Sequence, residues 1–414
     1  MLKMTHKLFH DDVNIREFDA QVLRCEALAE EKCAAYGAGA PLYAVWLDRT
    51  AFYAEAGGQT CDLGVLGGAQ VLDVQEDGAG DIYHVTDAPL AGRVQGRIDW
   101  ERRFSNMQQH GGQHLLSWAI HRQLGGYTYG LHIGAQECTI DTDLKQAPPR
   151  AVLDELERAV NEVIWRDLPV RQWFPSEQEL KTLPLRKPPT VTEHIRIVMT
   201  GDVECVACCG THPTSSGQIG LITILGAHPA RGKTRFSFLC GGRAYARLKA
   251  EAEACRAAGG LLSATHETLV QETRRVLDSA REQAHALAEF RRAELVRALP
   301  ELETRALMLP TGERVVAHRF DSADRDGLIK AASALIARPG TVALLAAGNA
   351  DGPGDLAVFA RAEDVVRDMG RFMREALAPL GGRGGGKPGF AQGGAPVEIP
   401  VAELAGKLNG GEGE

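Results

Sequence analysis

The chain has 414 residues, a formal net charge of -8 and 44% hydrophobic residues. This length allows two or three domains, and the acidic balance excludes a protein that grips nucleic acid over its whole surface. The sequence has no apolar run of about 18 residues and no apolar leader segment, so we expect a cytoplasmic protein with no membrane partner. Its nine cysteines are scattered, which favours free thiols and metal ligands over a disulfide framework.

The first 100 residues indicate short strands separated by glycine turns. Apolar and polar residues alternate over residues 41–76, around Gly57, Gly58, Gly64 and the pair at 67–68. Alternation with period two between glycine turns is typical of a β-meander or a small barrel. We therefore predict a glycine-rich β subdomain over residues 1–100.

Helices and strands alternate over residues 101–242, where we predict a second domain. Residues 106–126 place apolar side chains about 3.6 residues apart and end at Gly125 and Gly126, which predicts an amphipathic helix. A second amphipathic helix is predicted after Pro148 and Pro149. Strands are predicted over residues 195–201, 219–226 and 234–241.

A long stretch without proline follows at residues 243–297, rich in Ala, Glu, Arg and Leu. It predicts a helical hairpin or coiled coil over residues 243–300, interrupted near Gly259 and Gly260, with Pro300 and Pro310 on either side of its end. A helical spacer or a homodimer seam is its expected role. Residues 301–414 alternate strand and helix and predict a small α/β domain. The fold class predicted for the whole chain is α+β.

Two histidines four residues apart, His110 and His114, lie within the first predicted helix. This spacing places both imidazoles on one helix face, where they could hold one metal ion. A metalloprotease of the HExxH type needs a glutamate directly after the first histidine. Gly111 stands there instead, which disfavours protease chemistry.

A second pair, Cys208 and His212, is also four residues apart but lies in a turn after a predicted strand. Gly210 lets the chain fold back so that both ends of the turn face one point. The two pairs together make a complete tetrahedral zinc set. Four protein ligands also suit a closed structural site, and Cys205 or Cys209 could substitute as the thiolate ligand.

HxxxH followed about 90 residues later by CxGTH resembles the editing domain shared by alanyl-tRNA and threonyl-tRNA synthetases. Upstream, "LDRTAFYAEAGGQTCDLGVL" is similar to the glycine-rich subdomain of the alanyl branch. The tail "GGRGGGKPGFAQGG" (381–394) resembles the C-terminal domain of alanyl-tRNA synthetase. Nothing that resembles an aminoacylation domain precedes residue 40. The chain is therefore identified as a member of the free-standing alanyl-tRNA editing proteins, the AlaX type, in its long form.

This resemblance implies a hydrolase that removes serine, and also glycine, from mischarged alanine tRNA without ATP. His110, His114, Cys208 and His212 match the zinc ligands of the family one by one. Two roles for Zn²⁺ stay open: activation of the attacking water, or positioning of the substrate. Gln113, His132 and Thr211 are candidate catalytic or positioning residues, with ordinary packing as the alternative.

Two positions depart from the family pattern. Cys209 replaces a glycine of CGGTH, and Gly111 replaces the threonine that relatives often carry in HTxxH. A threonine hydroxyl at the second position could read the hydroxyl of a substrate serine, so Gly111 bears on specificity.

The glycine tail fits the pattern GxxxxGK, but Pro388 stands where a P-loop needs Ser or Thr, so ATP binding is not expected. Successive glycine N–H groups with two cations could bind the tRNA backbone, and a flexible loop is the alternative. The expected tRNA-binding residues are Arg383, Gly384, Gly385, Gly386 and Lys387.

Two other functions fit these motifs. One is a non-catalytic, zinc-containing tRNA-binding module. The other is an editing enzyme for a different mischarged aminoacyl-tRNA, such as Ser-tRNA(Thr).

Overall fold

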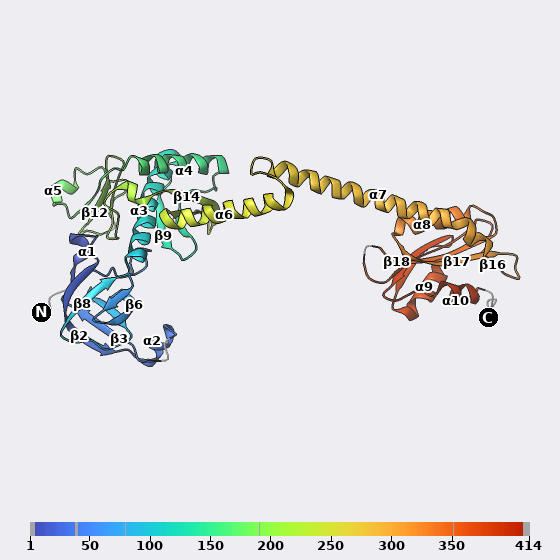
Figure 1. The fold of residues 1–414 in the computed structure, drawn as a ribbon, viewed down its shortest axis with the longest axis horizontal. Helices are drawn as coiled ribbons and strands as arrows, with labels where there is room; N and C mark the ends of the chain where they lie inside the picture. Colours follow the sequence, from blue (N-terminus) through green and yellow to red (C-terminus); the bar gives the residue numbers. More distant parts are fainter. Residues whose placement is uncertain (1–4, 38–39, 79, 190, 351, 409–414) are drawn as a thin grey trace. The chain divides into compact units, whose positions relative to one another are not determined.

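The computed structural model describes residues 5–408, except 38–39, 79, 190 and 351. It divides into two compact units, Met1–Cys255 and Arg256–Glu414 (Figure 1). Both units combine helices with sheets, which confirms the predicted α+β class. The finer domain boundaries at residues 100, 242 and 300 stay a prediction. Across the described residues, none of the helices combines the length and the apolar character needed to cross a membrane.

The predicted small barrel is present in the first unit. Six strands close it in the order β2-β3-β7-β6-β5-β8. Their bounds are β2 (Glu17–Ala27), β3 (Tyr43–Leu47), β5 (Gly64–Leu66), β6 (Ala69–Glu76), β7 (Ile82–Thr86) and β8 (Arg93–Ile98). Alternate residues point inward, and Val45, Leu47, Leu66 and Val74 are fully buried in the barrel core. Short elements surround it: β1 (His6–Lys7), α1 (Leu8–Asp11), α2 (Glu30–Ala35) and β4 (Arg49–Thr50).

A 25-residue helix, α3 (Trp100–Leu124), follows the barrel directly. It begins six residues before the predicted start, because the Asp99 carboxylate accepts a hydrogen bond from the Arg102 N–H at 3.1 Å and caps the helix. It ends at Gly125, whose φ of 69° is the left-handed conformation of a helix C-cap. The long helix therefore carries one set of residues beside the barrel and another set deep in the next layer.

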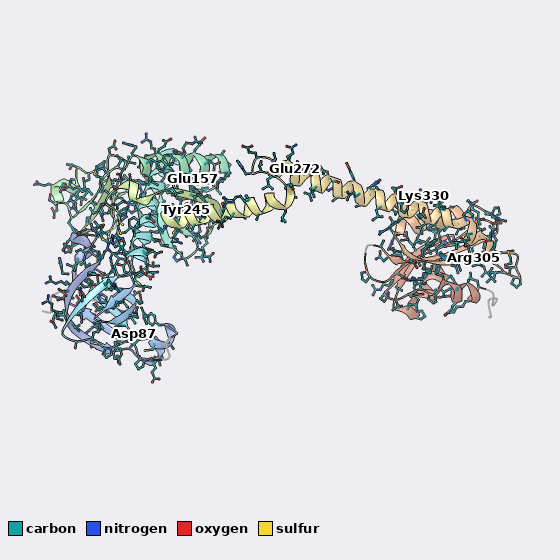
Figure 2. All side chains as sticks on the ribbon, in the orientation of Figure 1. Asp87, Glu157, Tyr245, Glu272, Arg305 and Lys330 are labelled. Carbon is teal, nitrogen blue, oxygen red and sulfur yellow. The ribbon has the colours of Figure 1, made fainter. Side chains whose placement is uncertain are left out.

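The second layer of the first unit packs α3 and α4 (Arg150–Trp165) on an antiparallel sheet in the order β14-β15-β10-β9. Glu157 of α4, which is labelled in Figure 2, accepts a hydrogen bond from the Ile224 N–H at 2.6 Å and connects the helix to the sheet. The strands are β9 (Thr128–Ile133), β10 (Cys138–Thr142), β14 (Ile222–Ala230) and β15 (Lys233–Cys240). The short 3₁₀ helix η1 (Ser216–Ile219) contacts both α3 and α4.

A separate three-stranded sheet, in the order β11-β12-β13, carries the cysteine-rich turn. Its strands are β11 (Val170–Trp173), β12 (Ile197–Thr200) and β13 (Glu204–Ala207), with α5 (Glu177–Leu180) after the first. Cys208 follows the last residue of β13, and its N–H donates to the Arg196 carbonyl at 2.9 Å. The turn therefore starts from a fixed strand end.

Two helices follow, α6 (Gly241–Leu262) and α7 (Leu269–Thr304), and they correct the predicted position of the interruption. The helical interruption was predicted near Gly259 and Gly260, but both lie inside α6, and the chain leaves the helix at Ser263, which has φ 52°. The end of this helical stretch was predicted between Pro300 and Pro310, and α7 ends there, at Thr304, with Pro300 inside the helix. Leu299 and Leu302 on either side of Pro300 are buried in the core of the second unit, so their packing holds the helix together past the proline.

The second unit is a six-stranded sheet in the order β16-β17-β18-β19-β21-β20, with helices on both faces. One face packs on α7 and α8 (Arg325–Ile336), and the other on α9 (Met369–Leu377) and α10 (Val401–Lys407). The strands are β16 (Leu307–Met308), β17 (Arg314–Ala323), β18 (Thr341–Asn349), β19 (Asp355–Arg361), β20 (Arg383–Lys387) and β21 (Phe390–Ala395), with η2 (Ala378–Leu380) before β20. The glycine tail therefore forms a hairpin of the edge strand β20 and its neighbour β21 rather than a loop.

Candidate metal centre

The four predicted metal ligands lie together in the first unit. His110 and His114 come from one face of α3, and Cys208 and His212 from the turn after β13. All their ligand atoms lie within 4.8 Å of one another. Cys208 Sγ is 3.4 Å from His110 Nε2 and 3.3 Å from His212 Nε2. Two pairs that are 98 residues apart in the sequence thus form one group.

This donor set fits a zinc ion. Zinc–sulfur and zinc–nitrogen bonds of about 2.3 and 2.1 Å at a tetrahedral angle separate the two donors by about 3.6 Å. The two observed separations, 3.4 and 3.3 Å, are close to that edge length. His114 Nδ1 is also buried with no hydrogen-bond partner among the described residues. An imidazole in this position would gain a partner if the group held a metal ion.

Burial determines the protonation of the group. It lowers the pKa of His110 to about 3, with a further contribution from the nearby Arg196 guanidinium, and lowers the pKa values of His114 and His212 well below 6.5. The three imidazoles are therefore neutral and keep lone pairs for a metal. Burial raises the pKa of the Cys208 thiol to about 11, so metal binding has to displace its proton.

The tight turn depends on Gly210. A Cβ there would lie 2.2 Å from His110 Cε1, so a side chain at this position would push the first histidine away. Cys209 is exposed at the family's other glycine position, so its side chain does not crowd the group.

The buried Arg196 hydrogen-bonds to the backbone of the turn that carries Cys208 and His212. Arg196 is 2% exposed and donates to the carbonyls of Cys208 and Gly210, at 3.2 and 2.8 Å. It also donates to Gln172 Oε1, and the Gln172 amide donates to the His212 carbonyl at 3.1 Å. These bonds bend the backbone so that the two ligands of the turn face the same point.

The three other predicted site residues lie in different surroundings. Thr211 is fully buried beside the group, and its hydroxyl accepts a hydrogen bond from Gln59 Nε2 at 2.7 Å. Gln113 is buried, but its amide donates to Ser117 Oγ at 2.6 Å, within its own helix. His132 is exposed on β9 and is not part of the group. Their roles in catalysis stay predictions.

Gly111 faces packed side chains. A Cβ at this position would lie 3.1 Å from Pro213 Cδ and 3.2 Å from Ile219 Cδ1. A threonine here would have to displace these neighbours. Gly111 therefore stands where this fold leaves little space for the threonine that relatives often carry.

A cavity of about 200 Å³ borders the metal group. Cys208, the most exposed of the four predicted ligands, lines it. This volume is below the roughly 300–1,000 Å³ of sites for drug-sized ligands, so the cavity suits a small group. Its other lining residues are Lys187, Pro188, Pro189, Val191, Ile195, Arg196, Val206, Ala207 and Cys209. The segment "LPLRKPP" thus forms one wall.

Sequence reasoning missed Gln59 and Arg196. Both are polar residues with ordinary neighbours in the sequence, and their partners lie in other segments of the chain. The only signal was that Gln59 stands directly after Gly57 and Gly58, inside the quoted glycine-rich segment.

Two family models match segments of this chain. The family described as "Threonyl and Alanyl tRNA synthetase second additional domain" matches residues 195–237, and the DHHA1 domain matches residues 312–409. The alanine–tRNA ligase of Pyrobaculum aerophilum is 33% identical over 95% of this chain, which spans only 43% of the ligase. The C-Ala domain of Aquifex aeolicus alanyl-tRNA synthetase matches 23% of this chain at 22% identity, with a TM-score of 0.21 that carries no argument.

One relative is similar along its whole length. The alanyl-tRNA editing protein AlaX-L of Pyrococcus horikoshii is 30% identical over 94% of this chain and 94% of its own. The first-unit match contains Cys208 and His212, and the second-unit match covers the strands β17 to β21 of the second unit. The identity and the shared coverage show that this chain belongs to the family of the alanyl-tRNA editing proteins AlaX-L.

Proposed function

We propose that this protein is a zinc-dependent aminoacyl-tRNA deacylase that hydrolyses the ester between serine, or glycine, and alanine tRNA. The observation that carries the proposal is the convergence of His110, His114, Cys208 and His212 in a chain of the alanyl-tRNA editing family. The reaction consumes one water and releases a free amino acid and a tRNA 3′-terminal ribose with its hydroxyl restored.

The buried residues around the group would prepare it for this reaction. When bound, zinc would supply Lewis-acid chemistry or hold the amino or hydroxyl group of the substrate. The neutral imidazoles provide its ligands, and the cavity beside Cys208 provides an entrance of the size of an aminoacyl group. Lys187 and Arg196 make this entrance positive, which suits the negatively charged end of a tRNA.

Selectivity for serine over alanine has to depend on one hydroxyl group. A site that hydrogen-bonds that hydroxyl leaves buried polar groups unpaired when alanine enters, and such a site rejects alanine strongly. Thr211 is the best-placed reader, because it is buried next to the ligands and its oxygen already accepts from Gln59. Because its oxygen accepts from Gln59 Nε2, the hydroxyl of Thr211 keeps its hydrogen for another acceptor.

Deacylation of a panel of purified aminoacyl-tRNAs tests the proposal. With zinc-loaded protein we expect rapid loss of serine, and also of glycine, from alanine tRNA, while Ala-tRNA(Ala) stays largely intact. Ser-tRNA(Thr) serves as the control for tRNA identity. Serine loss at the rate of the protein-free control would reject the enzyme, and faster loss from Ser-tRNA(Thr) would reassign its substrate.

A second function, a non-catalytic zinc-containing tRNA-binding module, is favoured by the four protein ligands, because closed sites of this kind are usually structural. The absorption spectrum of the Co²⁺-substituted protein separates the two functions. A spectrum that changes when a serine ester analogue is added would support an exchangeable position at the metal. A spectrum that does not respond would favour the structural role.

The edge strand β20 is our proposed tRNA-binding segment. Its glycines permit close packing: a Cβ at Gly384 would lie 2.7 Å from Met373 Cγ, and one at Gly386 would lie 2.2 Å from the Phe390 carbonyl oxygen. Gly385 has more room, with Arg374 Nη1 at 3.8 Å as its nearest neighbour. The exposed Arg383 and Lys387 at the two ends of the strand would contact phosphates.

Removing both charges in Arg383→Gln/Lys387→Gln should weaken tRNA binding and lower its salt dependence. Each phosphate contact contributes about 0.9 to the slope of log affinity against log salt, so the slope should fall by roughly one to two. The measurement is a salt titration of alanine tRNA affinity for the wild type and the double variant. Parallel lines would show that neither residue contacts the backbone.

Association of two copies through the C-terminal helices or domain stays a proposal. Apolar side chains on α7 are exposed, among them Val270, Leu277 and Phe290. Molar mass from light scattering coupled to gel filtration is the direct measurement.

A further inference from the structure

We infer that Gln59 is a positioning residue of the metal centre, which fixes the ring orientation and the tautomer of His110. The inference rests on the zinc site proposed above. Gln59 is fully buried, and its Oε1 lies 2.8 Å from His110 Nδ1. The same oxygen accepts from the Thr211 N–H at 3.2 Å, while Gln59 Nε2 donates to Thr211 Oγ1 at 2.7 Å.

These three contacts determine where the hydrogen atoms are. A backbone N–H can only donate, so the Gln59 atom that faces the Thr211 N–H has to be the carbonyl oxygen. The same oxygen faces His110 Nδ1, and an amide oxygen can only accept, so Nδ1 carries the hydrogen. A neutral imidazole has one hydrogen. His110 Nε2 is therefore unprotonated, and this is the nitrogen that lies 3.4 Å from Cys208 Sγ.

The barrel segment that carries Gln59 is fastened to the second layer. The Ile133 N–H of β9 donates to the Gly58 carbonyl at 3.0 Å, and a Cβ at Gly58 would lie 1.8 Å from the Leu131 carbonyl oxygen. Asn106 of α3 donates to Thr60 Oγ1 at 3.2 Å. Gly58 has φ 85°, a conformation that glycine adopts without strain. Gly58 thus lets the backbone approach β9 closely enough to place the Gln59 amide beside His110.

The side-chain amide of Gln59 therefore connects His110 on α3 to the turn that carries Cys208 and His212. Outer hydrogen bonds of this kind orient metal-binding histidines, and their loss typically lowers metal affinity about 10–100-fold. The glycine-rich segment would then be part of the metal centre, although it contributes no ligand.

The test compares three variants of the full chain. Gln59→Leu removes both the acceptor and the donor, and we expect zinc affinity to fall about 10–100-fold, measured by competition with a chelator. Gln59→Glu keeps an acceptor for His110 Nδ1–H and the Thr211 N–H, and should recover most of the affinity. Gln109→Leu is the matched control, because Gln109 is also fully buried on α3 but bonds to the N–H and carbonyl of Cys240. Its zinc affinity should stay within about twofold of the wild type.

A second measurement reads the tautomer directly. Long-range ¹⁵N–¹H correlation spectra of the zinc-free protein should show His110 protonated at Nδ1 in the wild type and in Gln59→Glu, and a mixture of tautomers in Gln59→Leu. Wild-type zinc affinity in folded Gln59→Leu, an equal loss in Gln109→Leu, or an unchanged tautomer in Gln59→Leu would each overturn the inference. None of these readouts uses tRNA, so a protein that binds zinc as expected and hydrolyses no ester would reject only the proposed function.

Discussion

Replacement of Cys208 by alanine is expected to remove zinc and deacylase activity together. Cys208 is the only sulfur donor of the group, and its sulfur lies 3.4 and 3.3 Å from the Nε2 atoms of His110 and His212. Loss of a direct ligand should cost more than the about 100-fold upper range for loss of an outer hydrogen bond. The measurements are zinc content per folded chain and the rate of serine release from Ser-tRNA(Ala). His110→Ala should behave in the same way.

The neighbouring cysteines provide matched controls. Cys209 is exposed and Cys205 is buried in β13, and neither belongs to the group of ligand atoms. Cys209→Ala and Cys205→Ala should each keep one zinc per chain. If Cys208→Ala retained both zinc and full activity, one of these two thiols would be the ligand and the assignment of Cys208 would be wrong.

Replacement of Arg103 by methionine should destabilise the first unit by about 3–5 kcal/mol, the usual cost of leaving one partner of a buried ion pair alone. Arg103 lies on α3 and is fully buried. Its Nε donates to both carboxylate oxygens of Asp62, at 3.1 and 2.9 Å, and its Nη1 donates to the Val13 carbonyl at 3.0 Å. Asp62 has one further donor, the Tyr53 N–H at 2.7 Å, which cannot neutralise its charge.

Urea unfolding followed by tryptophan fluorescence measures this effect, because all five tryptophans lie in the first unit. Arg235→Met is the control, since the pair of Arg235 with Asp141 is partly exposed and should contribute less than about 1 kcal/mol. Removing both buried charges in Arg103→Met/Asp62→Leu should recover part of the lost stability. A free energy of unfolding for Arg103→Met within 1 kcal/mol of the wild type would mean that water or a rearranged neighbour satisfies Asp62.

The two ligand pairs could be predicted from the sequence because each pair is local. A spacing of four residues on a helix places His110 and His114 on one face by geometry alone. In the second pair, Gly210 makes the turn tight enough for Cys208 and His212 to face one point. The alternation of apolar residues around glycine turns likewise predicted the barrel, because period two needs no knowledge of distant partners.

The joining of these pairs, and the residues that hold them, depended on tertiary structure. Gln59 reaches His110 over 51 residues and Thr211 over 152, so no local pattern could identify it. In the same way, α7 continues past Pro300 because Leu299 and Leu302 are buried in the second unit.

The glycine tail shows the same division between local pattern and tertiary structure. Its composition left a flexible loop open as the alternative to a phosphate-binding surface, because glycine loses much conformational entropy on folding and is depleted in strands. In the folded protein Arg383–Lys387 pairs along its length with β21 and lies under α9, where two of its glycines leave no space for a Cβ. The sequence by itself determined the ligand types and their local spacing, whereas long-range hydrogen bonding and burial decided which distant segments meet, because these contacts outweigh local backbone preference.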